Sequence, residues 1–131
     1  MTSLLLSGVI LPSNSKADEQ QIRCIATAIH YEARGSTLQD KMGVASVIMN
    51  RVKDRRFPKT PCSVVLQRNQ FSWTNGNWSY KSKYEELARK AFTGQLVDIT
   101  NNSLYFHNSS VNPRWSRNKK KTRIGSHYYM R

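Results

Sequence analysis

Two neighbouring stretches of the chain carry apolar residues at helical spacing, and this pattern limits the fold more than any other feature. In the first stretch, residues 20–33, one stripe holds Ile22, Ile25, Ala26, Ile29 and Ala33. In the second stretch, residues 38–52, one face holds Leu38, Met42, Ala45, Met49 and Val52. The sequence therefore predicts two helices that pack as a hairpin.

Local sequence signals predict where these helices end. Gly35 is expected to end the first helix. The helical spacing places Cys24 on the side away from the apolar stripe, where it could reach a loop. STLQ, residues 36–39, is typical of a capping box in which Ser36 is the N-cap of the second helix. The second helix is predicted to close at RRFP, because the residue before Pro58 avoids helical geometry.

The rest of the chain predicts shorter elements. SVVLQR, residues 63–68, fits one or two helical turns, and residues 69–80 fit a loop or short strands. SKYE, residues 82–85, is a second capping box and opens a helix that Gly94 ends. SLYFHN and RIGSHYYM, residues 103–108 and 123–130, read as two short β segments. At 131 residues the chain fits one domain of the α+β class, mainly helical.

The N-terminus resembles an export signal. An apolar run at residues 3–11 is followed by Pro12 and by small residues at Ser15 and Ala17. We therefore expect a signal peptide over residues 1–17, with cleavage after Ala17, and a single catalytic domain over residues 18–131. No Lys or Arg precedes the apolar run, and the alternative is a buried or frayed N-terminal segment. No later segment approaches the ~20 apolar residues of a membrane span.

The chain has two cysteines, Cys24 and Cys62. In an oxidising compartment an even number of cysteines favours a disulfide bond, and we expect these two to be paired. Two buried free thiols are the alternative.

The composition is strongly basic. Lys and Arg number 21 against 8 Asp and Glu, which gives a net charge of +13 and a pI near 10.2. Six basic residues and no acid lie in residues 114–123. Such charge favours a polyanionic partner, which is nucleic acid, an anionic membrane or an anionic bacterial wall. Export favours wall polymers, whereas a nucleic-acid-binding protein would remain in the cytoplasm.

Glu32 is the acid whose position most suggests chemistry. It lies at the shoulder of the apolar stripe in the first helix, and a carboxylic acid held against apolar side chains keeps its proton closer to neutral pH. The position alone fits equally a solvated side chain or a partner for Arg34.

Several motifs in order and spacing resemble the SleB-type cell wall hydrolases, across nearly all of residues 24–129. The matching segments are YEARG at 31–35, GVASVIMNRV at 43–52, RFPKTPCSVV at 56–65, QFSW at 70–73, LYFHN at 104–108 and RIGSHYY at 123–129. The resemblance implies a lysozyme-like helical fold with a small β part. It also implies cleavage of peptidoglycan glycan strands, with Glu32 as the catalyst.

In the lytic transglycosylase mechanism that the resemblance suggests, one carboxylic acid protonates the oxygen of the MurNAc–GlcNAc β-1,4 bond. Its carboxylate then takes a proton from the C6 hydroxyl, and a 1,6-anhydro product forms. A muramidase needs a second carboxylate, for which Asp40 and Asp98 are the candidates. Many family members carry Glu directly after EARG, where this chain has Ser36. This departure argues against an essential carboxylate at that position and leaves open whether hydrolysis accompanies transglycosylation.

The resemblance also implies glycan-binding residues, because aromatic and amide side chains suit sugar rings, hydroxyls and N-acetyl groups. Their alternative is a role in the core. The expected substrate-binding residues are Gln70, Phe71, Ser72, Trp73, Tyr105, His107 and Asn108.

We expect no metal or other cofactor, because the spacing of His30, His107 and His127 matches no zinc signature. The expected partners are peptidoglycan strands and anionic wall polymers, and neither nucleic acid nor stable membrane insertion is expected. The second hypothesis is a peptidoglycan-binding module without catalysis, in which Glu32→Gln would lose nothing.

Overall fold

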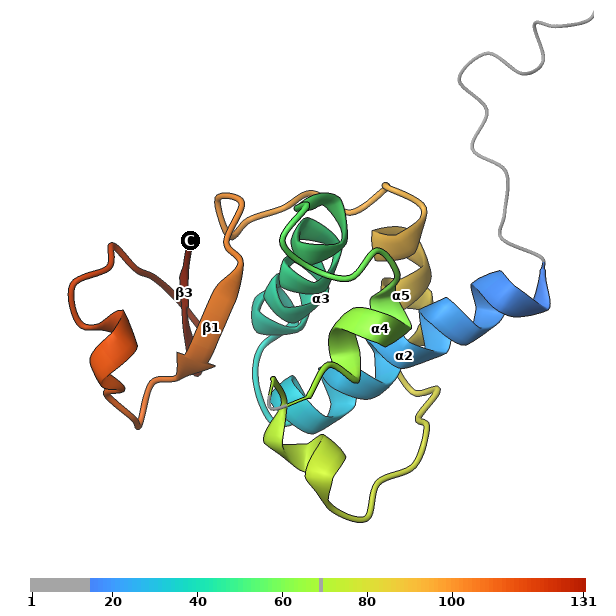
Figure 1. Ribbon diagram of the computed structural model, residues 1–131, viewed down its shortest axis with the longest axis horizontal. Coiled ribbons are helices and arrows are strands. Elements are labelled where there is room, and N and C mark those ends of the chain that lie inside the picture. Colours follow the sequence, from blue (N-terminus) through green and yellow to red (C-terminus); the bar gives the residue numbers. More distant parts are fainter. Residues whose placement is uncertain (1–14, 69) are drawn as a thin grey trace, which may run out of the picture.

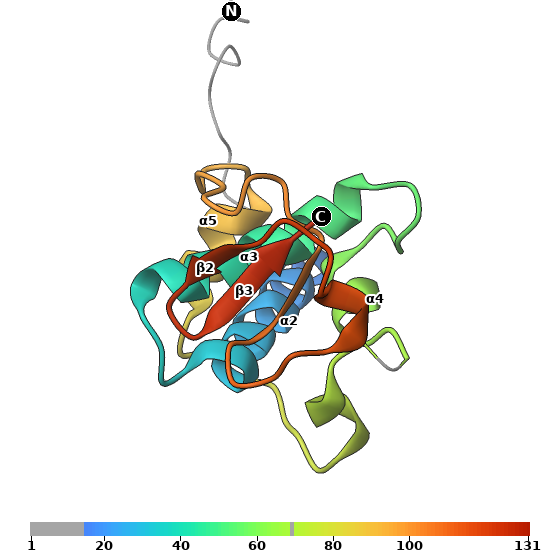
Figure 2. The ribbon, with the colours of Figure 1, turned by 90° about the vertical axis from the view of Figure 1, so that its left-hand side faces the viewer.

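The computed structural model describes residues 15–68 and 70–131, as a group of helices with a small sheet at one side (Figure 1). The helices are α2 (Lys16–Ala33), α3 (Leu38–Lys53), α4 (Pro61–Val65) and α5 (Glu85–Phe92). The strands are β1 (Tyr105–Asn108), β2 (Thr122–Ile124) and β3 (His127–Met130), and two 3-10 turns are η1 (Ser72–Asn75) and η2 (Arg114–Ser116). Figure 2 looks onto the sheet, with the helices behind it. The predicted α+β, mainly helical class is confirmed.

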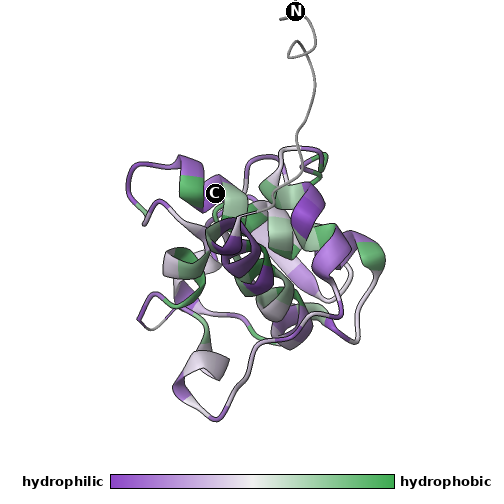
Figure 3. Cartoon of the chain, turned by 90° about the vertical axis from the view of Figure 1, so that its right-hand side faces the viewer, coloured by the Kyte–Doolittle hydropathy of each residue, from purple (hydrophilic) through white to green (hydrophobic). Residues whose placement is uncertain are grey.

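Helix α2 is the centre of the helical part, because α3, α4 and α5 all pack against it. The whole apolar stripe predicted for residues 20–33 is buried, so this prediction is confirmed. Figure 3 shows green and purple segments interleaved along the longer helices, as expected of helices with one buried face. Burial of the stripe fixes the rotation of α2 about its axis, and with it the direction of Glu32.

The buried face of α3 differs from the predicted one. Val44, Val47 and Ile48 are fully buried, whereas Leu38, predicted to be apolar and inward-facing, is 60% exposed. Ala45 is buried as expected. The reason is that α3 has partners on two sides, since it packs against α2 and also contacts β1 and β2. Helix α3 is therefore buried on two sides, whereas apolar periodicity predicts a single buried face.

Both predicted capping boxes are wrong in detail. The N-cap of α3 is Thr37, whose hydroxyl accepts a hydrogen bond from the Asp40 amide, and Ser36 lies one residue earlier. The Ser36 hydroxyl instead accepts from the amide of Ser126 at 3.3 Å, because the β2–β3 turn approaches it. Helix α5 begins only at Glu85 and has no side-chain cap. It ends as predicted just before Gly94, which has a positive φ of 79°.

The sheet has the strand order β1-β3-β2 and is antiparallel throughout. The first predicted β segment forms β1. The second, residues 123–130, contains a turn and contributes to two strands, because Gly125 adopts a left-handed φ of 58°. In the register of the sheet, Phe106 of β1 pairs with Tyr129 of β3.

The sheet is attached to α3 through Tyr129, which is almost fully buried. Its hydroxyl donates to the Asp40 main-chain oxygen at 2.9 Å and to Asp40 Oδ1 at 2.6 Å. A Cβ atom added at Gly43 would lie 2.6 Å from the Tyr129 ring, so only glycine permits this approach. The first two turns of α3 thereby set the distance between the helices and the sheet.

Cys24 and Cys62 form a disulfide bond between α2 and α4, so the predicted pairing is confirmed and the free-thiol alternative is wrong. Cys24 is itself buried, although it lies off the apolar stripe, because α4 covers that side of α2. Most of the predicted signal peptide, residues 1–14, lies outside the described residues. Within the described part of the chain, no helix is long and apolar enough to cross a membrane.

Candidate active site

Two adjoining hollows, of about 340 and 500 Å³, form a groove between the helices and the sheet. They share Arg51, Gln70 and Phe106 on their walls, so we treat them as one feature and call it the groove. The smaller hollow is also lined by Glu32, Phe71, Ser72, Asn75 and His107, and the larger by Tyr105, Trp115 and Lys119.

Glu32 enters the smaller hollow from the last turn of α2. Burial raises the pKa of the Glu32 carboxyl above its usual range, because a desolvated carboxylate is disfavoured. The nearby charge of His127 and the indole N–H of Trp73 lower this pKa, and the charge of Asp40 raises it again. The net effect keeps Glu32 protonated at higher pH than an exposed glutamate, which suits a proton donor.

Several aromatic rings lie near Glu32, because Trp73 interacts with its carboxyl group and Phe71 and Phe106 line the same hollow. Tyr31, the residue before Glu32, stacks on Trp73 with ring centroids 4.6 Å apart and planes at 15°. Trp73 also contacts Phe71 and Trp78. The Trp73 indole N–H is buried and lies near the Glu32 carboxyl group, whose pKa it lowers. In the described part of the chain, no other residue accepts a hydrogen bond from it.

Asp40 and His127 form a buried polar cluster near Glu32. His127 Nδ1 lies 2.9 and 2.8 Å from the two Asp40 carboxylate oxygens, and the side chain of Ser126 donates to Oδ2 at 3.1 Å. Burial acts to raise the pKa of Asp40, but hydrogen bonds from His127, Ser36 and Tyr129 outweigh it and hold this pKa at about 2. Asp40 is thus an ionised carboxylate whose oxygens are already bound.

Asp98, the other candidate for a second carboxylate, is bound elsewhere. Its oxygens accept hydrogen bonds from Thr100, Asn50 and the Asn102 amide, and they shape the turn that leads into β1. All eight acids of the chain lie in the described residues, and Glu32 is the only one that lines the groove. The site therefore brings together one carboxylic acid with polar and aromatic side chains.

The groove brings together most of the residues predicted to bind glycan. Gln70, Phe71, Ser72, Tyr105 and His107 line it. His107 is positioned there by Ser116, whose Oγ lies 2.9 Å from the His107 Nε2 atom.

The other two predicted residues are not on the groove wall. Trp73 lies behind Glu32, as described above, and Asn108 ends β1, where its Oδ1 accepts from the Ser110 amide at 2.8 Å. The side chain of Asn108 is thus engaged in the turn that follows β1.

Five residues of the groove are not among the expected substrate-binding residues, and they are Arg51, Asn75, Phe106, Trp115 and Lys119. Arg51 lies inside a motif of the resemblance, and this was the one signal that could have identified it. Trp115 is 52% exposed and contacts the Tyr105 and His107 rings, which makes it the most accessible aromatic side chain of the groove.

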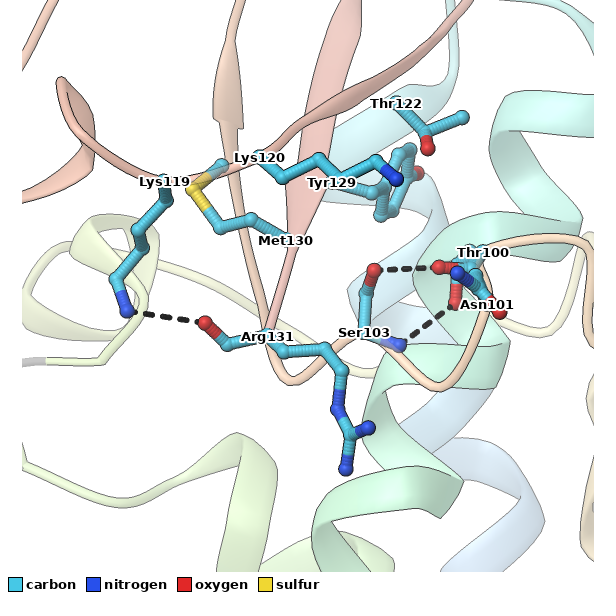
Figure 4. A pocket seen from close by; sticks show the side chains of 9 residues that line it. All are labelled: Thr100, Asn101, Ser103, Lys119, Lys120, Thr122, Tyr129, Met130 and Arg131. Carbon is cyan, nitrogen blue, oxygen red and sulfur yellow. Dashed lines mark hydrogen bonds between the residues drawn. The ribbon is translucent and has the colours of Figure 1, made fainter.

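A separate pocket of about 210 Å³ lies between the turn before β1 and the basic loop before β2 (Figure 4). Thr100 and Ser103 are hydrogen-bonded to each other on one side of it, and Lys119 donates to the Arg131 main-chain oxygen on another. Neither Asp nor Glu is among its lining residues, so it lacks the acid that glycosidic chemistry needs. In the described residues there is also no group of three His, Cys, Asp or Glu side chains placed to hold a metal ion.

Comparison with known proteins identifies related sequences. The sequence model of the Cell Wall Hydrolase family matches residues 35–130. The spore cortex-lytic enzyme of Bacillus cereus is 30% identical over 116 residues, which cover 85% of this chain and 44% of that protein. The spore cortex-lytic enzyme of Bacillus subtilis is 30% identical over 113 residues, covering 82% and 36%. The chain spans less than half the length of these curated relatives.

Two solved structures share the fold. The catalytic domain of the Bacillus cereus SleB protein superposes with a TM-score of 0.72 at 23% identity, covering 94% of this chain and 97% of that one. The catalytic domain of the germination-specific lytic transglycosylase SleB from Bacillus anthracis gives a TM-score of 0.73 at 24% identity, covering 92% and 100%. The described helices and sheet thus follow the architecture of these catalytic domains.

Proposed function

The chain belongs to the Cell Wall Hydrolase family, and on that premise we propose that its groove binds peptidoglycan and cleaves the MurNAc–GlcNAc β-1,4 bond, with Glu32 as acid and base. The relatives that match most of this chain are spore cortex-lytic enzymes, which supports a cell wall glycan as substrate. The family match begins three residues after Glu32, so support for Glu32 comes from its position in the groove.

The observation that carries the proposal is a single buried carboxylic acid at the wall of the groove. Burial raises the Glu32 pKa, so the protonated form persists toward neutral pH and can donate to the glycosidic oxygen. As the bond breaks, positive charge develops on the MurNAc ring, and the resulting Glu32 carboxylate lies beside it.

The same carboxylate then acts as the base. When it accepts the proton of the C6 hydroxyl, that oxygen closes on the anomeric carbon and gives the 1,6-anhydro product without consuming water. A hydrolytic outcome needs a second carboxylate to activate water or form a covalent intermediate. Asp40 and Asp98 are both hydrogen-bonded away from the groove, which favours the transglycosylase route.

The test is mass spectrometry of purified peptidoglycan after digestion by the wild type and by Glu32→Gln. Glu86→Gln is the matched control, because it makes the same chemical change on an exposed residue of α5. We expect anhydromuropeptides from the wild type and from Glu86→Gln, and a loss of at least about 100-fold in rate for Glu32→Gln. Circular dichroism and thermal melting establish that the three proteins are equally folded.

Two other outcomes contradict parts of the proposal. Reducing-end products from the wild type would replace the transglycosylase route with hydrolysis. Binding to peptidoglycan without any release of fragments would favour the non-catalytic binding module.

We also propose that the chain is exported and acts at the cell wall, with residues 1–17 removed. Cleavage after Ala17 would remove Ser15, whose hydroxyl caps α2 by accepting from the Asp18 amide at 2.9 Å, and would leave Asp18 at the new N-terminus. N-terminal sequencing of the exported protein is expected to begin at Asp18. Retention of residue 1 or 2 would contradict this.

A further inference from the structure

Arg51 is a buried cation at the junction of the two hollows of the groove. It comes from the last turn of α3, is only 4% exposed, and lines both hollows. Few charged side chains are buried to this extent unless they are paired, because removal of a charge from water is costly.

The contacts that hold Arg51 are all to neutral groups. Its Nε donates to the Leu104 main-chain oxygen at 2.7 Å, and its Nη1 donates to Gln70 Oε1 at 3.2 Å. The guanidinium also lies over three aromatic rings, with distances to the ring centroids of 5.0 Å for Phe57, 5.5 Å for Tyr105 and 5.7 Å for Phe71. These contacts fix the plane of the guanidinium but leave its positive charge uncompensated by any anion.

No carboxylate pairs with Arg51 among the residues that the structure describes. The ion pairs there involve Arg56, Arg89 and His127. Burial lowers the Arg51 pKa, and the nearby Tyr105 phenol acts in the opposite direction without reversing it. Arg51 Nη2 makes no hydrogen bond to a described residue, so donors remain available on a side chain that lines the groove.

We propose that Arg51 forms a carboxylate-binding subsite of the groove, in which the free guanidinium donors bind a carboxylate carried by the glycan substrate. This inference rests on the proposed function, because it concerns the same groove. A planar guanidinium held rigidly by aromatic faces is suited to bidentate binding of a carboxylate, and the partial exclusion of water strengthens the pair. The bound substrate thereby supplies the anion that the protein lacks.

Peptidoglycan offers carboxylates of two origins. One is the lactyl carboxylate of MurNAc, which is free where no stem peptide is attached, and the other belongs to the stem peptide itself. Arg51 would bind either source through the same carboxylate group. Two substrates distinguish the sources: intact strands carry the stem-peptide carboxylates, and strands stripped of peptides by an amidase carry only the lactyl carboxylate.

The test measures equilibrium binding of soluble glycan strands in a Glu32→Gln background, which removes turnover. Each substrate is used with free carboxylates and with carboxylates capped as neutral methylamides. Binding is measured at about 1 M salt, where attraction to the basic surface is screened but a buried pair persists. We expect methylamide capping of the bound carboxylate to weaken binding about tenfold or more. If Arg51 binds the lactyl carboxylate, this loss is seen with the stripped strands. If Arg51 binds the stem peptide, the loss is seen with the intact strands alone.

Arg51→Gln and Arg51→Lys provide the protein side of the experiment, and Lys90→Gln, on the exposed surface of α5, is the control. We expect Arg51→Gln to bind free and methylamide-capped strands equally well. Capping of the substrate carboxylates should weaken binding to Arg51→Lys only in part, and binding to Lys90→Gln by the full factor. In the active protein, Arg51→Lys is expected to raise KM more than it lowers kcat. If Arg51 had only a structural role, its substitution would lower both stability and kcat, and capping of the carboxylates would weaken binding as much as it does without the substitution.

Equal affinity for free and capped strands would overturn the subsite, whatever the Arg51 variants do, since this comparison needs only the Glu32→Gln protein. A wild type that cleaves peptidoglycan but binds capped strands equally well would overturn this inference alone. A wild type that cleaves nothing would instead overturn the proposed function.

Discussion

At the scale of single residues, the pKa of Glu32 depends on its burial and on side chains from three other parts of the chain. Burial raises this pKa, the negative charge of Asp40 raises it further, and His127 and Trp73 lower it. Glu32 therefore keeps its proton to higher pH than an exposed glutamate does. This arrangement leads to a prediction about stability as well as rate.

Glu32→Gln is expected to stabilise the fold at neutral pH. Because the folded-state pKa of Glu32 lies above that of the unfolded chain, the folded protein binds more protons in the window between them. Stability therefore falls as pH rises from about 4.5 through the folded pKa, and the neutral Gln avoids this loss. Thermal melting of both proteins should give equal values near pH 4 and a higher melting temperature for the variant at pH 7. A variant that is less stable at pH 7 would contradict the raised pKa.

The same titration predicts the shape of the rate profile. In the proposed mechanism the first step needs protonated Glu32, so kcat is expected to fall as pH rises through its raised pKa. A profile that stays flat above pH 5 would mean that another group supplies the proton.

At the scale of elements, the contact between α3 and β3 sets the width of the groove. Gly43 lets the Tyr129 ring approach the helix, and Asp40 binds the Tyr129 hydroxyl. Phe106, which pairs with Tyr129 across the sheet, then lines the groove from the opposite side to α2. A shift of the sheet against α3 would move Phe106 and His107 relative to Glu32.

Gly43→Ala is predicted to destabilise the protein by about 1–3 kcal/mol, because its Cβ would lie 2.6 Å from the Tyr129 ring and force a shift. In a helix interior the same change normally gains up to about 1 kcal/mol, so a loss identifies the clash. Gly35→Ala is the control, since a Cβ there meets nothing within 4 Å, and its effect should stay within about 0.5 kcal/mol. Urea unfolding measures both changes, and a stable Gly43→Ala would show that the sheet is free to move.

At the scale of the whole molecule, the disulfide bond joins α4 to the central helix and closes a segment of 38 residues. That segment includes all of α3 and the groove residue Arg51. Its closure restricts the unfolded chain more than the folded one.

The double substitution Cys24→Ser and Cys62→Ser is expected to lower the free energy of unfolding by about 2–4 kcal/mol, by the loss of this chain restriction. Unfolding by guanidinium with and without a reductant measures the difference. Reductant should weaken the wild type and leave the double variant unchanged. Equal stability of all samples would contradict a stabilising role.

The charge of the whole chain predicts salt-sensitive binding to the wall. Arg114 and Lys120 lie in the basic stretch but do not line the groove, so Arg114→Gln/Lys120→Gln tests surface attraction alone. We expect several-fold weaker binding to cell walls at low salt and no difference at about 1 M salt. Arg55→Gln/Lys90→Gln removes equal charge elsewhere and controls for net charge. Equal losses in both variants would mean that only the total charge matters.

The elements themselves were largely predictable from the sequence. The apolar stripe of residues 20–33, the stop at Gly94 and the strand at 105–108 follow from periodicity and local backbone preferences. The helical turns expected at residues 63–68 lie earlier, in α4 (Pro61–Val65), because Thr60 caps that helix and Pro61 begins it. The errors lie where long-range contacts compete with local signals, as at Ser36, which bonds the β2–β3 turn instead of capping α3. Leu38 is another, because the rotation of α3 is decided by two partners.

The candidate site divides in the same way. The sequence by itself predicted the candidate residues, since the apolar stripe places Glu32 at its own edge, and the motifs of the resemblance contain most residues of the groove wall. Only the tertiary structure decided which acids are bound elsewhere, that Arg51 is buried in the groove without an acid partner in the described residues, and that Asn108 faces away. The physical reason is that periodicity reports burial along one element, whereas pairing, desolvation and the shape of a groove arise between elements far apart in the chain.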